Sequence, residues 1–304
     1  HLILKPQGGA IALFTTVRLV FSIPNFKLNE TFYEILKASI NDQNLTIGDI
    51  FKRTKVVSNG GVNDRNFTLL GDPAVKLALP LNKIILDSVS YAKIKTDTIK
   101  AISTPTIHGK VLNPMNNESL NFNGWVEILL FDKIKPLITL ANDIGSVPYS
   151  YTAQEDLLFL GKANVKNGYF KAKIFVPKDA RQDFDLARLS FYAVDSTLGD
   201  ATGYDESIFI GGTDTNIITD NIGPNIEIYL DDSSFVFGDN VTPSPIFIAK
   251  LTDSSGVNII PNDVGKDINL TIDERSDLNY VLNDYYIPST KSFQQGEVIY
   301  PIDE

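Results

Sequence analysis

Residues that could act as nucleophiles or general bases are scarce in this sequence of 304 residues. It contains no cysteine, which excludes disulfides, thiolate metal sites and a cysteine nucleophile within the chain. The histidines are His1 at the chain start and His108 in an alternating, strand-like stretch. We interpret His108 as a residue on a strand surface, because a general base needs a positioned partner that the sequence does not show. A Ser-His-Asp triad through His108 stays open, since spacing alone does not reveal proximity.

Acidic side chains in loop-like segments are the other candidates for chemistry. They could bind Ca²⁺ through their carboxylates, and they are Asp231, Asp232, Asp239, Asp253 and Asp263. No EF-hand loop with its closing Glu is present, and loop aspartates commonly form turns. The Gly pairs at 8–9 and 211–212 lack the flanking residues of phosphate-binding loops. We therefore predict no catalytic, cofactor-binding or metal-binding residue, and no cofactor.

Composition and charge narrow the class of protein. Hydrophobic residues make up 43% and charged residues 21% of the sequence, which is ordinary globular usage. The net charge is −10 and the Lys and Arg residues are scattered, so we predict no nucleic-acid partner. No apolar run approaches the ~20 residues of a membrane-spanning helix, and no signal-peptide pattern opens the chain.

The first ~80 residues have α/β character. Residues 9–16 form a continuous apolar run, which predicts a strand buried on both faces of a parallel sheet. A helix is expected from about Asn29, with apolar residues at helical spacing: Phe32, Ile35, Leu36 and Ile40. A second helix is expected near Thr46, which has capping-box spacing to Asp49, with an inner face of Ile47, Ile50 and Phe51.

Beyond residue 80 the apolar pattern changes to period two, which predicts strands. In residues 168–176 the apolar face comprises Phe170, Ala172, Ile174 and Val176. Further strands are expected at residues 106–112, 125–131, 189–194, 226–230, 246–251 and 268–272. Gly, Asn, Asp and Pro clusters separate them, as in β-sandwich modules, and residues 211–224 resemble a linker. We predict domains at residues 1–79, 80–220 and 221–304.

Several motifs in order resemble one known family. Residues 8–22 (GGAIALFTTVRLVFS) resemble a stretch late in the catalytic domain of gingipain-like (C25) cysteine peptidases, and residues 69–74 (LLGDPA) look like the signature that closes that domain. Further similar motifs lie at residues 122–124, 131–133, 176–179, 220–224, 282–286 and 300–301. The resemblance covers nearly the whole chain. It is closest to the sortase-like member of the type IX secretion system of Bacteroidetes.

The resemblance implies a fold and an activity. The fold is an α/β remnant of a caspase-like domain, followed by all-β immunoglobulin-like sandwich modules. The implied reaction uses a thiolate that cleaves the C-terminal signal domain from exported cargo; an amine on a surface glycolipid then resolves the acyl-enzyme. The implied partners are exported cargo and outer-membrane secretion components, and the implied location is the extracellular, outer-membrane surface.

The chain also departs from the family. The nucleophilic Cys and the His-Gly general base of these peptidases lie upstream of the region that matches residue 8, so we transfer no catalytic residue. Where the family tends to have Gly-His-Asp, this chain has Lys266 between Gly265 and Asp267. We expect the C-terminal part of such a peptidase, inactive by itself. Residues 1–79 should then pack poorly or against a neighbouring chain, and the last sandwich should lack strands.

The alternative hypothesis is a non-catalytic surface adhesin whose β-sandwiches bind a partner or a polysaccharide. Sandwiches host many functions, so the fold alone does not separate the two hypotheses. The α/β segment before residue 80 favours the peptidase, since an adhesin has no need for it. A carbohydrate enzyme with accessory modules has no support from particular residues.

Overall fold

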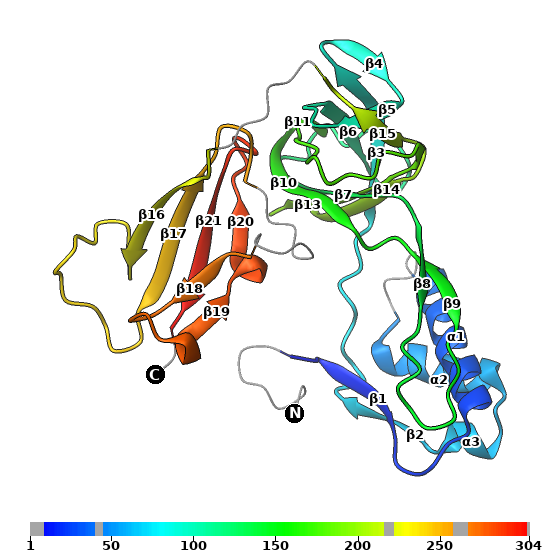
Figure 1. Ribbon diagram of the computed structural model, residues 1–304. Helices are drawn as coiled ribbons and strands as arrows, with labels where there is room; N and C mark the ends of the chain where they lie inside the picture. Colours follow the sequence, from blue (N-terminus) through cyan, green and yellow to red (C-terminus); the bar gives the residue numbers. More distant parts are fainter. Residues whose placement is uncertain (1–8, 40–44, 216–221, 258–266, 303–304) are drawn as a thin grey trace. The chain divides into compact units, whose positions relative to one another are not determined.

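The computed structural model describes residues 9–39, 45–215, 222–257 and 267–302 (Figure 1). The chain divides into two compact units, residues 1–81 and 82–304. The first unit contains β1 (Ala12–Thr16), α1 (Ser22–Ser39), α2 (Ile47–Ser58), α3 (Val62–Arg65) and β2 (Phe67–Gly71). Within the described ranges, every helix is too short or too polar to cross a lipid bilayer.

The first strand is not the parallel, doubly buried strand that its apolar run predicts. β1 pairs antiparallel with β2, from Ala12 opposite Gly71 to Thr16 opposite Phe67. Only one face of this two-stranded ribbon is covered, because Phe14 of β1 packs against the helices while Leu13 on the other face is 41% exposed. An apolar run alone does not distinguish these arrangements, since the pairing partner lies far away in the sequence.

The apolar faces of the helices lie where the sequence pattern predicts them, whereas the start of the first helix differs from the prediction. α1 begins at Ser22 rather than near Asn29, because Pro24 suits the first turn of a helix, where no N–H partner is needed. The ring of Phe32 in α1 lies 4.8 Å from that of Phe14, which also stacks at 4.8 Å on Phe51 of α2. The predicted member Ile40 lies outside the described residues.

The larger part of the second unit is a barrel-like sheet of strands. The strands and their connections are β3 (Asn82–Tyr91), β4 (Ile94–Thr96), β5 (Thr98–Ala101), β6 (Thr106–Leu112), β7 (Gly124–Phe131), β8 (Lys135–Ile138), β9 (Ser150–Ala153), β10 (Leu157–Lys166), β11 (Tyr169–Lys173), β12 (Asp185–Leu186), β13 (Arg188–Asp195), β14 (Gly199–Asp205) and β15 (Phe209–Thr213). The main sheet has the order β14-β13-β7-β10-β11-β6-β3-β4, and β14 also pairs with β3. This parallel β3–β14 pairing closes the sheet on itself (Figure 1).

Apolar side chains at alternate strand positions fill the interior of the barrel. Phe170, Ala172, Ile174 and Val176 are all buried, as predicted, whereas Lys171 is exposed. β6 occupies residues 106–112 as predicted, and the strands expected at 125–131 and 189–194 are each longer by one residue at one or both ends. The prediction of a mostly β, multidomain chain is therefore confirmed, with one module that is barrel-like rather than two separate sheets.

A smaller sheet follows in the chain. The elements of this part of the chain are β16 (Asn225–Leu230), β17 (Ile246–Thr252), β18 (Asn269–Thr271), the 3-10 helix η2 (Ser276–Leu278), β19 (Asn279–Val281), the 3-10 helix η3 (Asn283–Tyr285), β20 (Tyr286–Pro288) and β21 (Gln295–Pro301). The sheet order is β16-β17-β21-β20, and β18 pairs with β19 as a separate hairpin. Its core contains Phe247, Leu282 and Tyr286, and burial raises the pKa of Tyr286 to about 12. The domain boundary predicted at residue 220 lies outside the described residues and stays a prediction.

Candidate functional site

A capping box stands at the start of α2 in the α/β unit. The Thr46 hydroxyl accepts a hydrogen bond from the Asp49 N–H at 3.2 Å, and the Asp49 carboxylate accepts the Thr46 N–H at 3.1 Å. This is the capping box that the sequence predicts, and it satisfies N–H groups that have no partner inside the helix. The hydrogen bonds from the Thr46 backbone and hydroxyl lower the pKa of Asp49.

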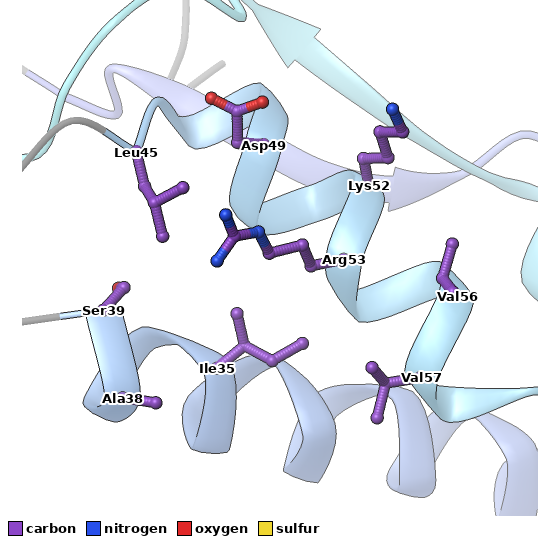
Figure 2. Close-up of a pocket in the computed structure, with 9 residues that line it drawn as sticks. All are labelled: Ile35, Ala38, Ser39, Leu45, Asp49, Lys52, Arg53, Val56 and Val57. Carbon is purple, nitrogen blue, oxygen red and sulfur yellow. The ribbon is translucent and has the colours of Figure 1, made fainter. Parts of the chain in front are cut away.

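A pocket of about 470 Å³ lies between α1 and α2. Its wall is largely apolar and its rim is charged; the lining residues are Ile35, Ala38, Ser39, Leu45, Asp49, Lys52, Arg53, Val56 and Val57. In Figure 2 the Arg53 side chain extends over the space between the helices, whereas Asp49 and Lys52 point away from α1. Within the described residues neither Lys52 nor Arg53 forms an ion pair.

The chemistry of this pocket is that of binding. The Ser39 hydroxyl donates to the Leu36 carbonyl at 2.7 Å, so it is held inside α1 and not presented to a substrate. The pocket contains no histidine or cysteine that could act as base or nucleophile. Apolar walls beside a guanidinium that forms no direct ion pair suit an anionic group that carries an apolar body.

His108 lies where the sequence predicts, on the surface of β6. Its Nε2 is 3.2 Å from the Ser90 hydroxyl on the neighbouring strand β3. No carboxylate of the described residues hydrogen-bonds to the His108 ring, so the third member of a Ser-His-Asp triad is not assembled there. His1 lies outside the described residues.

The loop aspartates that could have bound Ca²⁺ serve as turn formers. The Asp231 carboxylate accepts the N–H groups of Thr242 at 2.9 Å and Ile246 at 3.1 Å, and these bonds lower its pKa. Backbone N–H groups are likewise accepted by Asp232, Asp239 and Asp253. Across the described residues no three His, Cys, Asp or Glu side chains gather into a metal site. Asp263 and the Gly265-Lys266 pair lie outside those residues.

A buried charge cluster after β7 was noted in the sequence only as a motif, residues 131–133. Asp132 is 2% exposed and Lys133 is 1% exposed. The Lys133 ammonium lies 3.1 Å from the Asp132 carboxylate and donates to the Arg181 carbonyl at 2.7 Å. Arg181 is far away in the sequence, so no local pattern could have revealed this contact. The cluster joins two segments of the barrel.

The family match concerns the first unit, whereas the similar solved structures cover larger parts of the chain. Residues 1–78 match the model of Peptidase family C25. No curated protein matches the chain. One similar solved structure is dimeric latent PorU from Porphyromonas gingivalis, at 28% identity with a TM-score of 0.47. The match covers 97% of this chain, which spans only 28% of the length of that PorU chain.

Two further solved structures are similar at lower identity. The C-terminal domain of wzt is 16% identical, with a TM-score of 0.24, over 46% of this chain and 77% of that chain. Spo0M, a sporulation control protein from Bacillus subtilis, is 12% identical, with a TM-score of 0.26, over 73% of this chain and 90% of that chain. The resemblance that the motifs predict is confirmed by the family match: residues 1–78 of this chain are similar to Peptidase family C25.

Proposed function

We propose that this chain is a non-catalytic part of a secreted, sortase-like C25 cysteine peptidase. The parent enzyme would remove C-terminal signal domains from exported cargo and attach the cargo to the outer-membrane surface. The observation that carries the proposal is a match of residues 1–78 to the C25 family model in a chain without cysteine. A cysteine peptidase needs a thiolate, so the nucleophile must come from outside these 304 residues.

The uncovered apolar surface of the first unit supports this proposal. The outer face of the β1–β2 ribbon presents Leu13 and Leu70, both more than 40% exposed. α1 adds a second apolar stripe, because Ile23, Phe26 and Tyr33 are all more than 60% exposed. A two-stranded ribbon is marginally stable alone, and a large apolar patch marks a surface that meets another element. In this proposal the rest of a peptidase domain covers these faces.

The pocket between α1 and α2 would be covered by the same missing part of the peptidase domain. Its apolar wall includes the exposed Val56 and Val57, and Arg53 forms no direct ion pair among the described residues, although the Asp49 carboxylate is near enough to interact with it electrostatically. A covering segment that carries a carboxylate next to an apolar side chain would satisfy both features. The pocket is therefore proposed as a contact within the complete peptidase, and not as its substrate site.

The β modules would present the catalytic domain at the cell surface. In the barrel-like sheet β13 and β10 flank β7, while β3 and β11 flank β6. Antiparallel strands around one apolar core are also typical of immunoglobulin-like modules, although those modules divide the strands between two sheets. The antiparallel pairing is the feature that supports the immunoglobulin-like assignment, which is part of the proposal.

The test compares this chain with the complete gene product. We expect the purified 304-residue chain to hydrolyse no peptide substrate, and the complete product to be labelled by a thiol-directed active-site probe. In the source organism, loss of the gene should leave exported cargo with uncleaved C-terminal signal domains. Peptide hydrolysis by this cysteine-free chain, resistant to thiol reagents, would overturn the proposal. A complete product with only further β repeats would favour a surface adhesin.

A further inference from the structure

A pocket of about 670 Å³ opens on the outside of the barrel, where two neighbouring strands separate. β10 and β11 are joined by a tight turn, and Val165 with Phe170 is the last residue pair of their register. Asn164 and Lys171 would pair next, but the ladder ends before them, and both line the pocket. The end of the ladder thus opens a cavity whose volume lies in the range of small-molecule sites, about 300–1,000 Å³.

Three lysines line this pocket: Lys166 of β10, Lys171 of β11 and Lys291 from the loop before β21. All three are exposed, and within the described part of the chain their ammonium groups form neither an ion pair nor a hydrogen bond. The lining contains one carboxylate, Asp87, whose Oδ2 accepts the Ser88 hydroxyl at 3.2 Å. The pocket therefore carries an excess of positive charge in a chain whose net charge is −10.

Other lysines of the same strands have carboxylate partners. The Lys110 ammonium of β6 lies 2.8 Å from the Glu118 carboxylate, and that of Lys162 in β10 lies 3.8 Å from Glu127. The pocket lysines instead share a cavity with one another. Like charges that converge on one cavity repel, so an anion placed among them is attracted by all of them at once.

The rest of the lining adds uncharged hydrogen-bonding groups above an apolar floor. The Asn164 amide and the Thr290 hydroxyl line the pocket, and neither forms a side-chain hydrogen bond with the described residues. His108 contributes from the β6 side. Ala163 and Phe170, which are 5% and 4% exposed, form the floor. Such a lining suits a ligand with an anionic, oxygen-rich head.

We propose that this pocket binds a phosphate monoester. A monoester carries up to about two negative charges at neutral pH, which the three ammonium groups can neutralise. Lysine binds phosphate as a point charge, whereas the planar fork of arginine matches a carboxylate, and no arginine belongs to the described lining. The Asn164 amide and the Thr290 hydroxyl can donate to the remaining phosphate oxygens. The proposal does not rest on the peptidase assignment.

The monoester can belong to a soluble molecule or to a lipid headgroup, and two probes separate these sources. Glycerol 3-phosphate and phosphatidic acid carry the same phosphate group, the first free and the second in a bilayer. Titration calorimetry measures binding of glycerol 3-phosphate to the full chain, and co-sedimentation measures binding to phosphatidic acid vesicles, with phosphatidylcholine vesicles as the blank. Binding of glycerol 3-phosphate would identify a soluble ester as the source. Binding of phosphatidic acid vesicles alone would identify a headgroup.

A double variant, Lys166→Gln with Lys171→Gln, removes two of the three ammonium groups. We expect it to bind the recognised probe at least about tenfold more weakly, because hydrogen bonds from charged donors are the strong ones. The matched control is Lys173→Gln, which removes the same charge from the same strand at an exposed position outside the pocket. This control should bind like the unmodified chain. Circular dichroism checks that each variant is folded.

Three outcomes would overturn the proposal. The first is a chain that binds neither glycerol 3-phosphate nor phosphatidic acid vesicles. The second is a double variant that binds the probe as tightly as Lys173→Gln does, which would place the binding elsewhere. The third is displacement of the probe by a short polyglutamate peptide at equal concentration, since the pocket would then select negative charge and not phosphate.

Discussion

Asp132 and Lys133 follow β7 directly and are the most deeply buried charged pair in the described part of the barrel. The Asp132 carboxylate accepts the Arg181 N–H at 3.0 Å and the Lys133 N–H at 2.8 Å. Burial by itself would raise the pKa of Asp132, but these hydrogen bonds and the Lys133 ammonium outweigh it and lower the pKa. Each charge thus depends on the other for its place in the interior.

Asp132→Ala should therefore destabilise the second unit strongly. The substitution leaves the buried Lys133 ammonium with only the exposed Asp183 carboxylate, 3.9 Å away, and the loss of the close partner costs about 3–5 kcal/mol of unfolding free energy. Chemical denaturation measures this loss. The control is Asp277→Ala, which removes the exposed surface pair with Arg275 and should leave the unfolding free energy almost unchanged. Equal losses for the two variants would show that the buried cluster is not a stabilising contact.

Asp195 gives a pH-dependent prediction. Its carboxylate accepts the N–H groups of Asn123, Leu198 and Thr197, and these bonds lower its pKa. A lowered pKa in the folded state stabilises the fold above the unfolded-state pKa of about 3.9, and this stabilisation is lost as the pH falls through the folded value. The stability advantage of the unmodified chain over Asp195→Asn should be largest near neutral pH and shrink below about pH 4. Denaturation midpoints across that range measure it, and a constant difference would contradict the assignment.

At the scale of elements, the seam between β3 and β14 closes the barrel. The two strands pair in parallel, with Ala201 opposite Asn82 and Thr202 opposite Lys83. Gly203 lies at this seam, and a Cβ placed there would be 1.9 Å from the Ile84 carbonyl oxygen. The backbones can approach closely because this residue has no side chain.

Gly203→Ala should consequently open the seam. Since the clash is with backbone, a strand must move, and overpacking of this kind costs about 1–3 kcal/mol. Hydrogen exchange should lose protection in β3 and β14 before other strands. Gly223→Ala is the matched control, because nothing lies within 4 Å of its ideal Cβ. Unchanged protection of the seam in Gly203→Ala would mean that the closure does not depend on this glycine.

The strands show which features of the fold were predictable. β6 and the apolar face of β11 follow from period two, because alternation is a local property of the sequence. The capping box of α2 is local as well. The antiparallel partner of β1 and the closure of β14 onto β3 depend on residues distant in sequence, so periodicity could not reveal them. The same reason explains why the contact of Lys133 with Arg181 was missed.

At the scale of the whole molecule, the two units differ in how much apolar surface they bury. Within the described residues, the barrel has a continuous core that runs from Ile84 to Ile210. The buried hydrophobic residues of the first unit are fewer: Leu28, Ile47, Ile50 and Phe67. The motifs predict the family resemblance of residues 1–78 and, through it, poor packing of residues 1–79, whereas the structure was needed to show which faces are uncovered.

This contrast predicts that the first unit opens more easily than the second when the full chain is studied alone. Folding free energy comes mainly from buried apolar area, and a unit with few buried side chains has a low local stability. Hydrogen exchange followed by mass spectrometry should show faster exchange in α1, α2 and the β1–β2 ribbon than in β7, β10 and β13. The barrel strands are the internal control, since they belong to the same sample. If both units exchanged at one rate, the first would be fully stabilised without a covering partner, and the proposed role of its exposed apolar faces would fail.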